Sequence, residues 1–492
     1  MAAKLIYKDL AIGAAEDAAV STTPWEDFSS PGVLPFGVSS GTIATCEHNS
    51  WGLDGKFIPR GSQQFAFWST ELSGDDGAFA NPPQVSIAFD EKYTSTGLTL
   101  RFAPGVDEYC SQITVIWTRD GKEIDRGVFY PSASNYALEN TVEAFNGVSI
   151  SFEKTNLPKR RLKLEYIGIG IVREFDGTEL TGIKAIHEID LISDTVPINV
   201  LDASFHSTTD ADFIFQKKQP VEAYDGESLV GVYYIEKGER QSGQNYSISC
   251  QDAIGVLDLD TYDGGIWLDD TDIGVIIADV VGGAFVVELA PELVGRTLRG
   301  LIMPEKTRRE ALQQIAFALG ACVDTSGTNK IKMYLPQTGA GAEIPAVETY
   351  TGGKVTTSDM ITDVSVVGYD IADKEPDNED NVIEFKDKTY ECVPVWKDAK
   401  NPNVSVNTLI NKISYEDCYL ITGEMAQERA DAIMAYHMRR NVYSAKHILS
   451  GHNPGDRAKV TMPWGDVADA NVLKMTLTMS GINASDTEFL LD

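Results

Sequence analysis

Residues 187 to 260 read HEIDLISDTVPINVLDASFHSTTDADFIFQKKQPVEAYDGESLVGVYYIEKGERQSGQNYSISCQDAIGVLDLD. Apolar and polar side chains alternate along most of this segment. A period of two is typical of strands with one buried face. The alternating apolar residues are Ile189, Leu191, Phe205, Phe213, Phe215, Val230, Val232, Tyr234, Tyr246, Ile248 and Cys250. The segment therefore predicts a series of half-buried strands.

Turn-forming residues separate these expected strands. They occur at 194–197, at 217–220, at Asp225-Gly226 and at Ser242-Gly243. Glycine, proline and aspartate favour the backbone conformations of tight turns. Five or six short strands with tight connections indicate a small antiparallel barrel, which we place at residues 173–262. No catalytic motif occurs in this segment.

Three segments of the chain resemble one protein family. The first comprises PIN (197–199) and DFIFQKKQPVEAYDGESLVGVYYIEKGERQSGQNYSISCQDAIGVLD (212–258). The others are REALQQIAFALGACVDTSGTNKIKMYLP (309–336) and GDRAKVTMPWGDVADANVLKMTLTMSGINASDTEF (455–489). In content, order and spacing they resemble baseplate hub (tail-tip hub) proteins of tailed phages and phage-tail-like particles of Gram-positive bacteria. The resemblance covers about residues 173 to 492.

The resemblance implies a structural virion protein, made in the host bacterial cytoplasm and placed in the tail baseplate or tip. Such hubs are homotrimers in which each chain gives two similar barrels. Three chains would then offer a ring of six barrels, which would adapt the six-fold tail tube to the three-fold tip. The implied neighbours are the tail tube or distal tail ring, the spike or tip protein, and the C-terminus of the tape measure protein. Contractile, flexible-tailed and tailocin particles all remain open.

The pattern along the chain predicts a mainly β fold with minor α+β content. Residues 1–60 form an arm and loop region, and 61–172 a jelly-roll-like β-sandwich. The first hub-type antiparallel barrel (173–262) is followed by a small α+β domain (263–340). A second barrel (341–492) contains a helix at 422–440. Within 263–340, helical spacing of apolar residues predicts two helices. The first is a short helix capped by Asp270 or Thr271 and ended by Gly282-Gly283, and the second is at about 305–320, ended by Gly320.

The sandwich resembles, in its general pattern, jelly-roll domains of the galactose-binding type. This resemblance suggests an alternative function, in which the sandwich binds host surface glycans or serves a wall-degrading tail protein. A sugar site would need exposed aromatic and polar side chains in loops. By residue type, the candidates are Trp51, Trp68, Tyr93 and Tyr109. Packing of Trp68 in the core is the competing interpretation.

One basic run stands out in this acidic chain. It consists of Lys159, Arg160, Arg161 and Lys163, at the end of the expected sandwich. Four charges on a strand are too few for a nucleic-acid groove. We therefore predict that these residues contact an acidic neighbouring subunit.

The overall charge excludes some classes of partner. The formal net charge is −32, which disfavours direct nucleic-acid binding and an anionic membrane surface. No run of about 18 apolar residues occurs, so we expect no membrane insertion. The six cysteines are widely spaced without a CxxC pair, and we interpret Cys250 and Cys322 as reduced core residues.

The sequence contains few of the catalytic motifs that we sought. HExxH and Walker patterns are absent, and the GxSxG match GVSSG, at 37–41, falls in the expected arm and loop region. We therefore predict no catalytic, cofactor-binding or metal-binding residues, no cofactor and no enzymatic activity.

Overall fold

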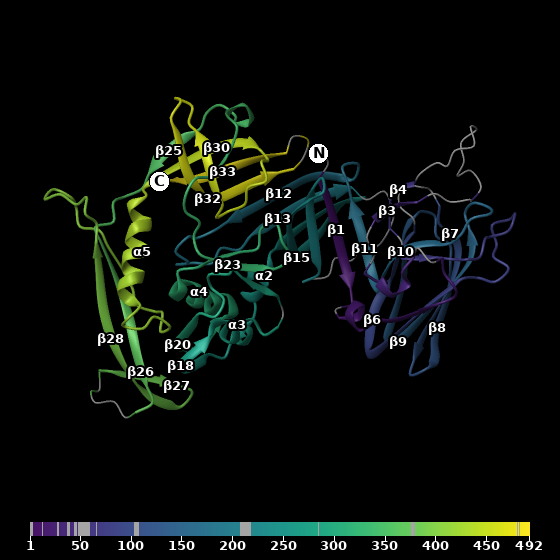
Figure 1. The fold of residues 1–492 in the computed structure, drawn as a ribbon, viewed down its shortest axis with the longest axis horizontal. Coiled ribbons are helices and arrows are strands. Elements are labelled where there is room, and N and C mark those ends of the chain that lie inside the picture. The colour runs from purple at the N-terminus through teal and green to yellow at the C-terminus, as the bar shows by residue number, and fades with distance from the viewer. Residues whose placement is uncertain are drawn as a thin grey trace. The chain divides into compact units, whose positions relative to one another are not determined.

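The computed structural model describes residues 3–11, 13–26, 29–36, 40–43, 47, 60–64, 66–102, 108–206, 218–283, 285–374, 378, 380–479, 481 and 483–492. The chain forms two compact units (Figure 1). The N-terminal unit is Ile6–Glu174, and the C-terminal unit comprises Met1–Leu5 and Phe175–Asp492. Two strands, β1 (Ala3–Leu10) and β11 (Gly170–Phe175), have residues in both units. Strands predominate in both units, which confirms the expected mainly β fold class.

The N-terminal unit is built on one antiparallel sheet with the order β5-β10-β6-β9-β7-β8. Its core contains the alternating side chains Val85, Ile87 and Phe89, as the period of two predicts. Register shifts interrupt the pairing of β6 with β9, and β6 continues through them as one long strand. The strands are β5 (Phe67–Trp68), β6 (Gln84–Phe102), β7 (Cys110–Arg119), β8 (Lys122–Phe129), β9 (Asn135–Thr155) and β10 (Lys163–Gly168).

Residues before 61 belong to the same compact unit. β2 pairs with β6 from Ala19↔Ala88 to Thr22↔Val85, and Ala14 and Leu34 join the core. The segment expected to be an arm therefore supplies a strand of the sheet. Its elements are α1 (Ala14–Asp17), β2 (Ala19–Thr22), η1 (Pro31–Val33), β3 (Ser40–Ile43) and, paired with β3, β4 (Arg60–Gln64).

The C-terminal unit contains a sheet that joins strands from both predicted barrel regions. Its path includes β14-β15-β16-β13-β12-β32-β33-β30-β25. The joint is the antiparallel pairing of β12 with β32, from Lys184↔Thr478 to Glu188↔Lys474. The strands are β12 (Leu180–Glu188), β13 (Val200–His206), β14 (Pro220–Asp225), β15 (Ser228–Ser242), β16 (Asn245–Gln251), β25 (Lys354–Thr357), β30 (Asn441–Ile448), β31 (Arg457–Thr461), β32 (Val467–Thr478) and β33 (Ala484–Leu491).

Both faces of β15 bear apolar side chains, which changes how its alternation is interpreted. Tyr233 and Ile235 are buried, whereas Val232 and Tyr234, which the pattern selects, are half-buried. Tyr234 packs edge-to-face on Phe285, with ring centroids 5.4 Å apart. The other selected residues Phe205, Tyr246, Ile248 and Cys250 are buried. Phe213 and Phe215 lie outside the described residues.

Two helices follow the first group of strands, as the sequence predicts. α3 (Ile273–Val281) begins after the cap Asp272, and α4 (Arg308–Leu319) begins with a capping box between Thr307 and Glu310. Gly320, at φ 65°, ends α4 in the left-handed conformation that glycine adopts without strain. Shorter elements surround them: α2 (Ala253–Leu257), β17 (Thr261–Tyr262), β18 (Gly265–Asp272), β19 (Val287–Leu289), β20 (Thr297–Ile302), β21 (Lys306–Thr307), β22 (Cys322–Asp324), β23 (Ile331–Tyr334), β24 (Ala342–Glu343) and η2 (Ala346–Glu348).

A separate four-stranded sheet lies within the region expected to be the second barrel. Its order is β27-β28-β26-β29, and helix α5 (Ala426–Met438) packs on β26 and β28 (Figure 1). Ile433 of α5 shares a core with Leu312 of α4 and Val364 of β26. The strands are β26 (Asp363–Ala372), β27 (Val382–Phe385), β28 (Lys388–Lys400) and β29 (Lys412–Tyr415). No helix in the described ranges is long and apolar enough to cross a membrane.

Candidate functional site

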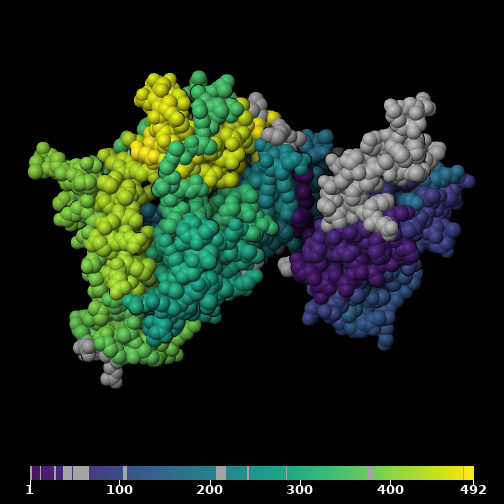
Figure 2. All heavy atoms as spheres, viewed as in Figure 1, coloured from purple at the N-terminus to yellow at the C-terminus, as the bar shows by residue number. Residues whose placement is uncertain are grey.

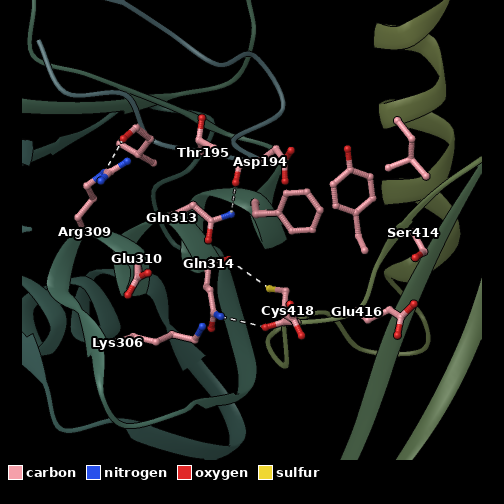
Figure 3. A pocket seen from close by; sticks show the side chains of 15 residues that line it. Asp194, Thr195, Lys306, Arg309, Glu310, Gln313, Gln314, Ser414, Glu416 and Cys418 are labelled. Carbon is pink, nitrogen blue, oxygen red and sulfur yellow. Dashed lines mark hydrogen bonds between the residues drawn. The ribbon is translucent and has the colours of Figure 1, made fainter. Parts of the chain in front are cut away.

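A cleft in the C-terminal unit lies between α4 and residues 413–418, which form the end of β29 and the segment after it (Figure 3). Its volume is about 490 Å³. α4 contributes Arg309, Gln313 and Gln314, and the opposite wall contains Ser414, Glu416 and Cys418. The Asp194–Thr195 segment closes one side. The cleft is therefore polar, with acidic, basic and amide side chains around it.

Most of these polar groups hold segments of the chain together. Arg309 Nε donates to the carbonyl oxygen of Val196 at 2.8 Å, and Gln313 Nε2 donates to that of Ser193 at 2.7 Å. Gln314 Nε2 donates across the cleft to the carbonyl oxygen of Asp417 at 2.9 Å. These bonds fix the cleft's walls, because neighbouring residues of α4 anchor different segments.

The cleft contains no activated nucleophile among the residues that line it. The Cys418 thiol donates to the Gln314 carbonyl oxygen at 3.5 Å, and burial raises its pKa to about 11. A thiol with this pKa stays protonated near neutral pH and is a poor nucleophile. Burial likewise raises the pKa of Tyr415, which also lines the cleft. The residues that line the cleft therefore lack the nucleophile–base pair of hydrolytic sites.

A second group of polar residues is buried beneath the sheet of the C-terminal unit. Asp252 caps α2 by accepting from the Gly255 N–H at 3.0 Å, and it accepts from Thr325 Oγ1 at 2.6 Å. Asn199 Nδ2 donates to Thr325 Oγ1 at 2.9 Å, and its Oδ1 accepts from the Glu188 N–H at 2.9 Å. The network thus connects β12, α2 and the turn after β22.

Burial shifts the pKa values of three groups in this region. Desolvation raises the pKa of Asp252 to about 6 and that of Asp324 to about 6. Desolvation lowers the pKa of His187 to about 4, and its Nε2 is hydrogen-bonded to the Tyr233 hydroxyl. The physical cause is the same in each case, because a low-dielectric interior disfavours the charged form. Neither the carboxylates nor the histidine is exposed to a substrate, so we assign them a structural role.

The candidate glycan-binding residues do not gather into one exposed platform in the described part of the N-terminal unit. Trp68 is 1% exposed. Tyr93 is half-buried, and its hydroxyl donates to Asp17 Oδ2 at 3.0 Å. Tyr109 is half-buried against the core of the unit. Trp51 lies outside the described residues.

The basic run is divided between the interior and the surface of the N-terminal unit. Lys163 is 3% exposed, and its Nζ lies 2.7 Å from Glu47 Oε1 and 2.8 Å from Glu108 Oε2. Arg160 is also buried, with its Nε 3.0 Å from Glu108 Oε1. Both side chains are buried and form ion pairs within the unit, so they are not accessible to another subunit.

The remaining two basic residues lie nearer the solvent. Lys159 is exposed and pairs with Asp75 at 2.9 Å. Arg161 is half-buried, and it donates to the carbonyl oxygens of Ser69 and Thr70 at 2.8 and 2.6 Å. Of the predicted contact residues, Lys159 alone has a largely exposed side chain.

Sequence reasoning did not find the Figure 3 cleft or the buried Asp252 network. The cleft residues come from segments about a hundred residues apart, so no local motif marks them. Asp252 does carry a signal, since an aspartate directly before an apolar helical segment is a favoured N-cap. Among the described residues, no group of histidine, cysteine and carboxylate side chains could hold a metal ion.

Comparison with known proteins gave matches among solved structures only. No family model and no curated protein matches the chain. A tail protein from Neisseria meningitidis MC58 is 12% identical with a TM-score of 0.48, over 65% of this chain and 94% of that one. Prophage tail protein gp18 from Listeria monocytogenes EGD-e is 11% identical with a TM-score of 0.43, over 64% and 91%.

A third match is a component of the E. coli type VI secretion system, described as structurally similar to the bacteriophage T4 tail proteins gp27 and gp5. It is 10% identical with a TM-score of 0.39, over 64% of this chain and 74% of that one. The first two of these structures are tail proteins, and the third is a secretion-system component.

Proposed function

We propose that this chain is a structural hub protein of a phage tail or a phage-tail-like particle. The observation that carries the proposal is the pairing of β12 with β32. This pairing brings a group of strands from 180–251 and a group from 354–491 into one sheet. The sequence resemblance to hub proteins implies two similar barrels in each chain, and these two groups of strands lie in the regions predicted for them. The place of the protein is then the baseplate or tip of the virion tail.

In this role three chains form a ring in which each supplies its two strand groups. Three chains with two groups each offer six similar positions to the tail tube and three to the tip. The ring would contact the tube or distal tail ring on one side and the spike on the other, with the tape measure C-terminus as a further neighbour. The N-terminal unit would contact baseplate neighbours.

The role is structural and not enzymatic. Two observations support this part of the proposal. The Cys418 thiol and the Tyr415 phenol, which line the Figure 3 cleft, have raised pKa values. The side chains of His187, Asp252 and Asp324 are buried. Glycan binding by the N-terminal unit gains no support from the buried Trp68 or from Tyr93, whose hydroxyl is hydrogen-bonded.

Imaging of particles tests the proposal. Tails from a producing strain should contain this chain at the tip, as a ring with six lobes and three-fold symmetry. Deleting its gene should give particles without a tip, and the wild-type gene on a plasmid should restore them. Normal tails from the deletion strain would overturn the proposal. A purified assembly of three times 53.7 kDa would agree with it.

A further inference from the structure

Residues 401–411, which connect β28 to β29, expose aliphatic side chains to solvent. We call this segment the apolar tip. Val406 is 101% exposed, Leu409 88% and Ile410 77%. A contiguous group of exposed aliphatic residues on a folded protein is typical of an interaction surface. Figure 2 shows this part of the C-terminal unit projecting from its surface at the left.

Hydrogen bonds hold the apolar tip in a defined conformation. At its base, the Thr362 N–H donates to the Asn411 carbonyl oxygen at 2.8 Å, and the Asn401 N–H donates to the Thr362 carbonyl oxygen at 2.9 Å. At its end, the Ser405 N–H donates to Thr408 Oγ1 at 2.9 Å. The aliphatic side chains are therefore presented by an ordered turn, which reduces the entropy lost on binding.

Charge indicates what the apolar tip contacts. Residues 399–415 contain no acidic residue and include Lys400 and Lys412, which lie on either side of Asp363 in the sheet, in a chain with a net charge of −32. Residues 258–279, which we call the acidic face, contain seven aspartates and no lysine or arginine; Asp258 and Asp260 pair with Arg309 and Lys218 of other segments. Asp269 and Asp270 are exposed there, beside helix α3, on which Val275 is 59% exposed. A basic and apolar surface and an acidic and apolar surface are complementary.

These two surfaces lie at opposite ends of the four-stranded sheet. β27 pairs with the beginning of β28, up to Val382↔Glu391, and Phe385 of β27 packs with Ile266 and Leu268 of β18. The apolar tip follows Lys400 at the other end of β28. About nine residues of strand separate the two ends by roughly 30 Å. Figure 1 shows β18 and β27 together, away from the loop at the far end of β28.

We propose that the apolar tip of one chain docks on the acidic face of a second copy of this chain. The two surfaces cannot meet within one chain, because the sheet holds them apart. Between copies they form a head-to-tail contact, which repeats around a closed ring. The inference rests on the proposed hub function and deepens it by naming the surface through which the chains associate.

The test compares self-association of purified full-length variants. The variant Val406→Ser/Leu409→Ser/Ile410→Ser changes only exposed side chains, so it should fold normally. We expect the wild-type chain to reach a multiple of 53.7 kDa with rising concentration in sedimentation, and the variant to associate roughly 100-fold more weakly. The control Val286→Ser/Val294→Ser/Val347→Ser removes three other exposed valines and should associate as the wild type does.

A charge exchange tests the identity of the occupant. Lys400→Glu/Lys412→Glu and Asp269→Lys/Asp270→Lys should each weaken self-association, and a mixture of the two variants should associate again. If the tip variant assembles as the wild type does, the inference is overturned and the hub proposal remains in place. The occupant of the apolar tip would then be a different protein. A wild-type chain that stays monomeric at every concentration also overturns the inference, whereas particle imaging decides the hub proposal separately.

Discussion

Replacing Asp252 by asparagine should make the stability of the C-terminal unit less sensitive to pH. Asp252 is 1% exposed and its folded-state pKa is raised from 3.8 to about 6 by burial. A raised carboxyl pKa means that the folded state binds the proton more tightly than the unfolded state. The stabilisation is therefore complete below about pH 4 and is lost as the pH rises through about 6.

The magnitude follows from the shift. About two pKa units at about 1.4 kcal/mol each give a total loss of about 3 kcal/mol. Between about pH 5 and about pH 7.5, roughly half of this, about 1.4 kcal/mol, is lost. The side-chain amide of the Asp252→Asn variant would stay neutral at both pH values. Its carbonyl oxygen could still accept from the Gly255 N–H, as Asp252 Oδ1 does at 3.0 Å.

Urea denaturation at the two pH values measures this effect. The free energy of unfolding of Asp252→Asn, relative to the wild type, should rise by about 1.4 kcal/mol from about pH 5 to about pH 7.5. His187, whose lowered pKa of about 4 acts in the opposite direction, is present in both proteins and cancels. Asp202→Asn, an exposed aspartate on β13, is the matched control. A difference that does not change with pH would refute the reasoning.

Three further substitutions test other parts of the structure. Lys163→Met should destabilise the N-terminal unit by about 3–5 kcal/mol, because buried Glu47 and Glu108 each lose an ion pair with Lys163. Lys159→Met, at an exposed pair, should change the melting temperature of the unit little. Thr307→Ala removes the cap of α4 and should lower the free energy of unfolding, measured by urea denaturation, by about 1 kcal/mol. Ala185→Asp places a charge on the buried face of β12. Hydrogen exchange should then show that the backbone amides of both neighbouring strands, β13 and β32, lose protection. The control Lys184→Asp, on the exposed face of β12, should leave both strands protected.

The helices could be predicted because their signals are local. Thr307, Glu310 and Gly320 mark the two ends of α4 within one stretch of sequence, and Leu312 and Ile315 are buried as their spacing predicts. The strands of the N-terminal unit were predictable from alternation for the same reason. Which face of β15 is buried could not be predicted from alternation. Apolar side chains pack on both faces of this strand, so Val232 and Tyr233 are equally plausible core residues.

The long-range features could not be predicted, since they depend on residues distant in sequence. The basic run that contains Lys163 predicts exposed side chains, yet Lys163 is buried. Its ammonium group is paired there with Glu47 and Glu108, which are more than fifty residues away in the sequence. Lysine is rarely buried without such partners. The Figure 3 cleft is likewise formed by α4 and a segment about a hundred residues later.

The pairing of β12 with β32 has a mechanical consequence for a hub. β12 is bonded to β13 on one side and to β32 on the other, and Glu188 of β12 also pairs with Lys474 of β32 at 2.8 Å. The two strand groups therefore cannot turn relative to each other without breaking a backbone ladder. The Asp252 network below β12 resists the same motion, since Asn199 accepts from the Glu188 N–H. In the hub that we propose, each chain would offer two positions at a fixed spacing to a six-fold partner. This rigidity would keep the register of the proposed ring, because a flexible link would let each group bind independently.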